Sequence, residues 1–251
     1  MLRSLFTAVA LFFALPQHAL AFDIENMTTD ERAAFQLEVR RYLLENPQVI
    51  MDAVAVLEEQ QRQQAQAAAT SMIASNADEI FNDEHSWVGG NPSGDVVVVE
   101  FLDYRCGFCR RAHPEVEELV ASDGNIRIIV KEFPVLGEAS VTSSRLAIAV
   151  KELAGDEAYK VVHDALITLT SDVSPLVITR LSNQLGLDPD DVMAKMESRE
   201  VSDIIRKNRA LAQSLGINGT PTFILGDVLQ RGYAPLEQMR ETVEAVRASN
   251  G

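Results

Sequence analysis

The sequence predicts an α/β protein in which a strand–helix–strand half and a strand–strand–helix half flank an all-helical insertion, preceded by a helical N-terminal extension. Three observations support this prediction. Two β-rich runs, 96–102 and 125–133, enclose a helical pattern that begins at Cys106. Helical periodicity then continues through about 140–215. β-rich residues return only at 220–233.

Residues 1–21 have the pattern of a secretory signal peptide. Arg3 precedes the apolar run LFTAVALFFAL, and Ala-Leu-Ala at 19–21 matches an A-x-A cleavage site. The apolar run is short for a membrane span, although an uncleaved anchor remains the alternative. We therefore expect a mature chain that begins near residue 22 and acts after export, in the periplasm.

The charge balance argues against one large class of partners. The chain carries 22 Lys and Arg against 37 Asp and Glu, a net charge of −15, and loss of Arg3 with the signal peptide makes it −16. Binding to a phosphate backbone requires clustered cations, so we expect no nucleic-acid partner. The sequence predicts no cofactor.

Residues 22–80 are predicted to form a helical extension. Thr28 and Glu31 have the spacing of a capping box, and Asn46-Pro47 ends the first helix and begins a second. The second helix continues into EEQQRQQAQAAAT, which favours helix but offers little apolar surface to bury. Two interpretations are open: a solvated linker helix, and an arm through which residues 23–80 associate into a homo-oligomer.

The main domain is predicted over residues 85–251. The cluster of Gly, Asn, Pro and Asp in VGGNPSGD at 88–95 indicates a turn, after which 96–102 has the apolar character of a buried strand. A helix from Cys106 to Ser122 and a strand at 125–133 follow. A strand–helix–strand unit of this length predicts two parallel strands.

The remaining elements are predicted by the same patterns. Apolar residues recur at helical spacing through the insertion at about 140–215, and Asp188-Pro189 opens a short helix within it. Gly226-Asp227 can turn a hairpin between two short strands. Apolar residues at helical spacing then predict a closing helix: Met239, Val243 and Val246.

Cys106 and Cys109 are the only cysteines in the chain, and they form a Cys-x-x-Cys pair. As a structural disulfide the pair would close a very short loop and add little stability. A zinc site normally has four ligands, whereas His85, His113 and His163 are scattered without ligand spacing. Export and the spacing favour redox use, with the structural disulfide and the metal site as lesser alternatives.

A helix that begins at the pair would make Cys106 reactive. Unsatisfied N–H groups at a helix N-terminus stabilise an anion, so the pKa of Cys106 is expected to be low. Cys106 is then the attacking thiolate, and Cys109, one turn further on and more buried, resolves the mixed disulfide with a substrate protein. Gly107 and Phe108 add no charge, which predicts a less oxidising pair than one with a histidine between the cysteines.

Glu100 is a carboxylate inside an apolar strand. An unpaired buried ion costs several kcal/mol, so this group either becomes neutral or has a partner. It lies six residues before Cys106, below the predicted helix start, where it can accept the proton of Cys109. Lys131, at the end of the next strand, is the candidate partner. The alternative is a Glu100 that faces solvent at a strand edge.

Three segments together resemble a known family: VVEFLDYRCGFC at 98–109, KEFPVLG at 131–137 and GTPTF at 219–223. They are similar to the DsbA-like branch of the thioredoxin superfamily. This resemblance implies a thioredoxin fold with a helical insertion and a protein thiol–disulfide oxidoreductase, oxidase or isomerase. The extension at 22–80 is similar to the ScsC (suppressor of copper sensitivity) type, some members of which oligomerise through that extension and isomerise disulfides.

The resemblance also implies part of the site. Pro221 is expected to follow a cis peptide bond beside the cysteines, where Thr220 offers its backbone to an extended substrate segment. The alternative is a trans proline that opens an edge strand. The best-known oxidases of the family have Pro-His between their cysteines, whereas Thr220 resembles the isomerases and reductases, so the direction of exchange stays open.

The implied partners are unfolded or misoxidised exported proteins and a membrane redox partner that resets the cysteines. Two functions of other classes remain as alternatives. The two thiols can hold Cu(I), which soft thiolates select. A chaperone-like module that binds unfolded chains is the second.

Overall fold

The computed structural model describes residues 24–250, so the signal peptide predicted at 1–21 lies outside the described residues. The described chain divides into two compact units, one that ends at Glu59 and one that begins at Gln60. Within residues 24–250, no helix combines the length and the apolar character that a membrane crossing requires.

The first unit consists of α1 (Thr29–Glu45) and the beginning of α2 (Gln48–Ser75). The predicted capping box is confirmed, because Glu31 N donates to the Thr28 hydroxyl while the Glu31 carboxylate accepts from Thr28 N. None of the side chains in residues 24–59 is buried. Large apolar side chains are instead exposed here: Leu37, Val39, Tyr42, Leu44, Val49, Ile50, Met51, Val54, Val56 and Leu57.

The second unit is built on a five-stranded sheet with the order β1–β3–β2–β4–β5. The strands are β1 (Trp87–Gly90), β2 (Val96–Leu102), β3 (Ile126–Glu132), β4 (Thr222–Leu225) and β5 (Val228–Arg231). β2 and β3 are parallel and are joined by α4 (Gly107–Asp123), whereas the other neighbouring pairs are antiparallel. The predicted α/β architecture is therefore confirmed.

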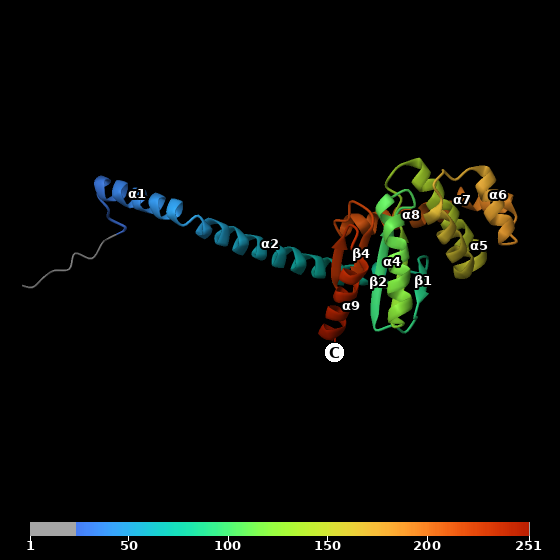
Figure 1. Ribbon diagram of the computed structural model, residues 1–251. Helices are drawn as coiled ribbons and strands as arrows, with labels where there is room; N and C mark the ends of the chain where they lie inside the picture. Colours follow the sequence, from blue (N-terminus) through green and yellow to red (C-terminus); the bar gives the residue numbers. More distant parts are fainter. Residues whose placement is uncertain (1–23, 251) are drawn as a thin grey trace, which may run out of the picture. The chain divides into compact units, whose positions relative to one another are not determined.

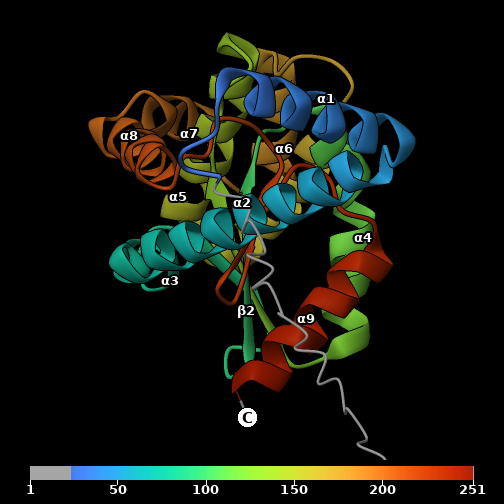
Figure 2. The same ribbon diagram turned by 90° about the vertical axis from the view of Figure 1, so that its left-hand side faces the viewer.

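Helices cover both faces of this sheet. On one face α4 and α9 (Leu236–Asn250) lie side by side (Figures 1 and 2). The helical insertion follows β3 as α5 (Glu138–Thr168), α6 (Pro175–Gln184), α7 (Pro189–Met196) and α8 (Arg199–Ser214). On the other face, α8 and the short α3 (Ala77–Phe81) contact β3 and β2. Because both faces are covered, β2 is apolar almost throughout.

The alternating side chains of β2 divide between two hydrophobic cores. Val98 and Leu102 belong to the core under α4, α5 and α9. Val99 and Phe101 belong to the core on the other face, which also contains Ile73 from the end of α2. The boundary between the two units thus lies at 59–60, earlier than the 80–85 expected from the sequence, because the end of α2 is buried against the sheet.

β1 was not predicted, since the glycines around it indicated a turn. Trp87–Gly90 forms an edge strand that pairs with β3. Gly90 has φ 70°, and a Cβ added there would lie 2.3 Å from the Ile126 carbonyl oxygen. Glycine is required here by the close approach of a neighbouring strand, which local sequence does not reveal.

Candidate active site

Cys106 and Cys109 lie where β2 ends and α4 begins. Cys106 is the N-cap residue of α4, and Cys109 is in the first turn of the helix. Both are free thiols. Cys109 is completely buried, whereas Phe108 between the cysteines is 59% exposed. The predicted helix start at Cys106 is therefore confirmed.

Asp103 holds the turn that precedes the pair. It is completely buried, and its carboxylate accepts hydrogen bonds from Arg105 N at 2.8 Å, Val135 N at 2.8 Å and Leu136 N at 3.0 Å. Its carbonyl oxygen accepts from Cys106 N at 3.0 Å. Asp103 thus joins the segment after β3 to the cysteine turn. Asp103 was not among the predicted site residues, although an acid directly after a buried strand and before the cysteines was a signal.

The Thr220–Pro221 peptide bond is cis, as expected. β4 begins at Thr222 and pairs with β2, and this pairing carries Thr220 to the cysteines. The Cys106 thiol donates to the Thr220 carbonyl oxygen at 3.1 Å.

The surroundings of Cys106 favour its thiolate. A hydrogen bond from the Cys109 thiol has the largest effect, and donors from Thr220 and from the N–H groups of Cys109 and Phe108 add to it, so the pKa of Cys106 falls to about 5. Burial opposes this shift. The Thr220 carbonyl also opposes it, because a carbonyl accepts only from the protonated thiol. The helix N-terminus thus contributes as predicted, but the other cysteine is the strongest donor.

Cys109 holds its proton firmly. It donates to Cys106, it is buried, and the nearby Glu100 and Cys106 are negative when ionised, so the pKa of Cys109 is raised far above its ordinary value. The two thiols therefore differ as an attacking and a resolving thiol should.

Glu100 is only 5% exposed, which excludes the solvent-facing alternative. Burial raises its pKa to about 8, with smaller contributions from Glu117, Glu132 and Cys106. Since alternate residues of β2 face opposite sides, Glu100 lies on the face covered by α4, as does Cys109. The expected position beneath the cysteines is therefore found, and the carboxyl is mostly neutral at pH 7.

Lys131 is not the partner of Glu100, so that prediction was wrong. In the register between β2 and β3, Lys131 pairs with Phe101, which places its side chain on the opposite face of the sheet from Glu100. There the buried Lys131 ammonium forms an ion pair with Asp83 and donates to the Glu79 carbonyl oxygen at 2.6 Å. Sequence spacing alone does not give the register of two separate strands.

Glu132, for which the sequence predicted no role, is a second buried carboxylate. Its Oε1 accepts from the Tyr104 hydroxyl at 2.7 Å and from the Tyr159 hydroxyl at 2.6 Å. The Tyr104 hydroxyl also lies 3.0 Å from His163 Nδ1. Burial raises the pKa of Glu132 to about 7, although the tyrosine hydrogen bonds oppose it. An acid inside a second apolar strand was the signal that could have found it.

Two of the histidines that are scattered in the sequence meet in the fold. The rings of His113 and His163 are 5.3 Å apart, and His113 Nε2 is 3.5 Å from an oxygen of Asp164. This set has metal-binding donor types. However, the Lys160 ammonium donates to both Asp164 oxygens, at 2.8 and 2.7 Å, and Glu117 lies 3.2 Å from the same ammonium. The Lys160 ammonium is thus already bound to the Asp164 carboxylate, in the place of a metal ion.

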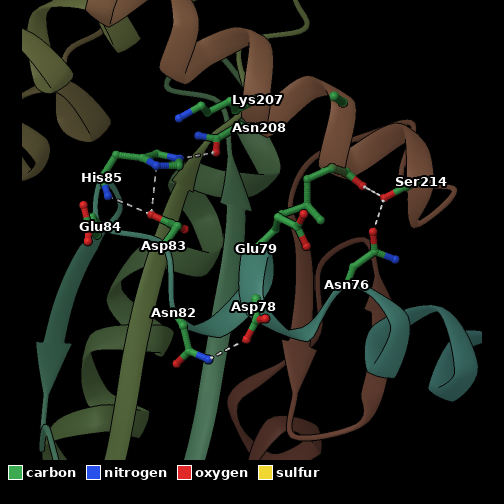
Figure 3. Close-up of a pocket in the computed structure, with 12 residues that line it drawn as sticks. Asn76, Asp78, Glu79, Asn82, Asp83, Glu84, His85, Lys207, Asn208 and Ser214 are labelled. Carbon is green, nitrogen blue, oxygen red and sulfur yellow. Dashed lines mark hydrogen bonds and ion pairs between the residues drawn. The ribbon is translucent and has the colours of Figure 1, made fainter.

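A hollow of about 660 Å³ lies on the opposite face of the sheet, between α3 and α8 (Figure 3). Figure 3 shows the His85 ring between Asp83 and Asn208. Its Nδ1 lies 3.2 Å from an oxygen of Asp83, and its Nε2 lies 3.2 Å from an oxygen of Asn208. Several polar side chains of this hollow bind one another, such as His85 with Asn208 and Ser214 with Asn76, and neither cysteine lines it. The hollow is therefore separate from the two cysteines at the end of β2.

Known protein families match two parts of the chain. The family model of the DSBA-like thioredoxin domain matches residues 97–244, and that of the copper resistance protein ScsC N-terminal domain matches residues 31–64. A thioredoxin-like oxidoreductase from Silicibacter pomeroyi is 40% identical, with 68% of this chain and 97% of that chain covered and a TM-score of 0.63. The thiol–disulfide exchange protein alpha-DsbA2 from Wolbachia pipientis is 31% identical, with 72% and 97% covered and a TM-score of 0.66.

A periplasmic thioredoxin-like protein from Salmonella enterica serovar Typhimurium is 26% identical, with 68% and 95% covered and a TM-score of 0.62. The first curated relatives are longer proteins. The chain is 26% identical over 162 residues to a Na(+)/H(+) antiporter NhaA of Salinispora tropica and spans 25% of its length. From the paired cysteines at the start of α4, the cis proline beside them and these matches, we conclude that the chain belongs to the DsbA-like thioredoxin domain family of thiol–disulfide oxidoreductases.

Proposed function

We propose that this protein exchanges disulfides with exported proteins in the periplasm, with Cys106 as the attacking thiolate and Cys109 as the resolving thiol. The observation that carries the proposal is the contrast between the two sulfurs. The pKa of Cys106 is lowered to about 5, whereas Cys109 is buried and its pKa is raised. The cleavage pattern at 19–21 and the periplasmic relative support the compartment.

The exchange begins when the Cys106 thiolate attacks a substrate disulfide and releases one substrate thiolate. Cys109 then gives its proton to Glu100 and attacks the Cys106 sulfur, which releases the second substrate thiolate. The products are a Cys106–Cys109 disulfide and a substrate reduced by two electrons. The reverse sequence oxidises a substrate dithiol, and a membrane redox partner resets the pair after either direction.

In this proposal, the charge of Cys106 determines when the proton of Cys109 can move to Glu100. While Cys106 is a thiolate, its charge helps to raise the pKa of Glu100. In the mixed disulfide that charge is gone, so the pKa of Glu100 falls and its carboxylate form becomes more populated. Glu100 is therefore better able to accept the Cys109 proton at the step that needs an acceptor.

The surface beside the cysteines suits an extended, partly apolar substrate segment. Phe108 is 59% exposed and Leu136 is 57% exposed, and Asp103 ties the backbone of Leu136 to the cysteine turn. Thr220 can pair its backbone with such a segment. An unfolded exported protein offers both features. The uncharged Gly107-Phe108 pair and Thr220 favour the isomerase or reductase direction over the oxidase direction.

Insulin reduction by variants of the two cysteines tests the proposal. Cys106→Ala is expected to abolish the reaction, because no thiolate remains to attack. Cys109→Ala keeps the attacking thiolate and loses the resolving thiol, so it should accumulate mixed disulfides that mass spectrometry detects. Insulin reduction by Cys106→Ala at the wild-type rate would contradict the proposal.

We also propose that the first unit mediates self-association. Residues 24–59 bury no side chain, and an apolar hollow of about 460 Å³ in this unit is lined by residues that include Val39, Leu43, Leu44 and Ile50. Exposed apolar surface of this extent is typical of an interface. The match of residues 31–64 to the ScsC N-terminal domain supports the same proposal.

A further inference from the structure

Glu132 and Glu100 are buried carboxyls on neighbouring parallel strands. The register pairs Glu100 with Val130, so Glu132 lies two residues further along β3 and on the same face of the sheet. Glu132 is 3% exposed. Two carboxyls in this arrangement repel each other when both are ionised, because burial reduces the screening between them.

Glu132 is held in one position by hydroxyl groups from two directions. Tyr104, directly after β2 and Asp103, and Tyr159 of α5 both donate to Oε1, at 2.7 and 2.6 Å. Because the Tyr104 proton is used in this bond, His163 Nδ1 must donate to the Tyr104 oxygen, at 3.0 Å. The Glu132 Oε2 atom is buried and has no hydrogen-bond partner among the described residues.

Few groups around this pair change their charge near neutral pH. Burial raises the pKa values of Tyr104 and Tyr159 and lowers that of His163 to about 3, so the tyrosines stay protonated and the histidine stays neutral. The other ionisable groups that face the two carboxyls are Asp103 after β2, the Cys106 and Cys109 thiols, and Glu117 of α4. His113 of α4 faces His163, and burial lowers its pKa as well.

We propose that Glu132 is a positioning residue for the resolving step: from the neighbouring strand it acts on the Glu100 carboxyl that receives the Cys109 proton. This inference rests on the proposed function. Ionised Glu132 raises the pKa of Glu100, and it thereby sets the pH above which the Glu100 carboxylate is populated and can accept the Cys109 proton. The tyrosine donors favour the ionised form of Glu132 and so maintain this effect.

Glu132→Gln tests the inference, because glutamine keeps an oxygen for the two tyrosines and removes the charge. Reduced protein reacts with dithionitrobenzoate in two steps, each releasing one thionitrobenzoate: Cys106 attacks first, and Cys109 then closes the disulfide and gives up its proton. Without the Glu132 charge the pKa of Glu100 falls. The midpoint of the second step should therefore move to lower pH, by about one unit. The first step should keep its pH dependence.

Two further variants serve as controls. Glu157→Gln removes the same charge from the exposed side of α5, and it should leave both steps unchanged. Tyr159→Phe keeps the Glu132 carboxyl and removes one donor, so more of Glu132 is neutral. It should move the second step in the same direction as Glu132→Gln but by less. If Glu132→Gln fails to fold, Tyr159→Phe by itself tests the inference.

A midpoint of the second step that stays at the wild-type pH in Glu132→Gln, or in Tyr159→Phe if only that variant folds, would overturn the inference. A purely structural role of Glu132 would lower stability and leave this midpoint in place. If the proposed function is wrong, Cys109→Ala should still show the second step as the wild type does. The two failures are therefore distinguishable.

Discussion

At Cys106, hydrogen-bond donors from three sources converge on one sulfur atom. The Cys109 thiol, Thr220 and the N–H groups of the first turn of α4 all favour the thiolate. Burial and the Thr220 carbonyl oppose them, yet the pKa of Cys106 is still lowered to about 5. The reactivity of this residue thus depends both on Thr220, just before β4, and on its own helix.

The pH dependence of alkylation follows from this pKa. In the reduced protein, the rate of Cys106 modification by iodoacetamide should be constant above about pH 6 and fall tenfold per unit below about pH 5, because only the thiolate reacts. Cys109 should not react in this range, since its pKa is raised. Mass spectrometry of quenched samples separates the two sites. A midpoint near 9, the ordinary value of a thiol, would contradict the described hydrogen bonding.

At the scale of elements, two consecutive residues of β3 point to opposite faces of the sheet and make different contacts. Lys131 points to α3 and pairs with Asp83, two residues after that helix, whereas Glu132 points to α5 and its tyrosine. Alternation along a strand makes this division unavoidable. The strand therefore separates a structural ion pair on one face from the redox site on the other.

Lys131→Met should destabilise the fold without altering the chemistry. It leaves the Asp83 carboxylate, only 9% exposed, without its cation, and breaking a buried pair in this way costs about 3 kcal/mol. Urea unfolding should show this loss, while the insulin-reduction rate of the folded variant stays at the wild-type value. The double variant Lys131→Met with Asp83→Asn should recover part of the stability, because the uncompensated charge is gone. A stable single variant, or one with altered reduction kinetics, would contradict the assignment.

At the scale of the whole molecule, one of the two units has a hydrophobic core, whereas the other has none within the residues that the structure describes. The second unit has two cores on the faces of its sheet. The first unit exposes its apolar residues, including Leu44 at 69%. Exposed apolar surface of this extent is typical of an interface, and in the proposed self-association a second copy of the same unit covers it.

Deletion of residues 24–59 should convert an oligomer into a monomer, as measured by light scattering of the mature protein. A single Leu44→Glu substitution in the apolar hollow should weaken association as well, because it places a charge in the interface. Gln48→Glu, outside the hollow, adds the same charge and should leave the oligomer intact. An intact chain that is already monomeric would remove the self-association proposal.

Much of the site could be predicted because its chemistry follows local rules. The spacing of Cys106 and Cys109 and the strand before them indicated a thiolate at a helix start. Glu100 stood out as an acid among apolar residues. The predicted pairing of Lys131 with Glu100 was wrong, and the Tyr104–Glu132–Tyr159 contacts were not predicted. These contacts depend on the register of β3 and on the path of α5.

The sequence by itself determined the order of most helices and strands, the capping of α1, the position of the cysteines at a helix start and, by resemblance, the cis proline. These properties depend on residues close together in the chain or on recognisable motifs. Only the tertiary structure decided which side chains share a face, that Trp87–Gly90 is a strand and that the end of α2 packs on the sheet. The physical reason is that strand register and burial arise from contacts between distant segments, each of which permits several pairings until the others are in place.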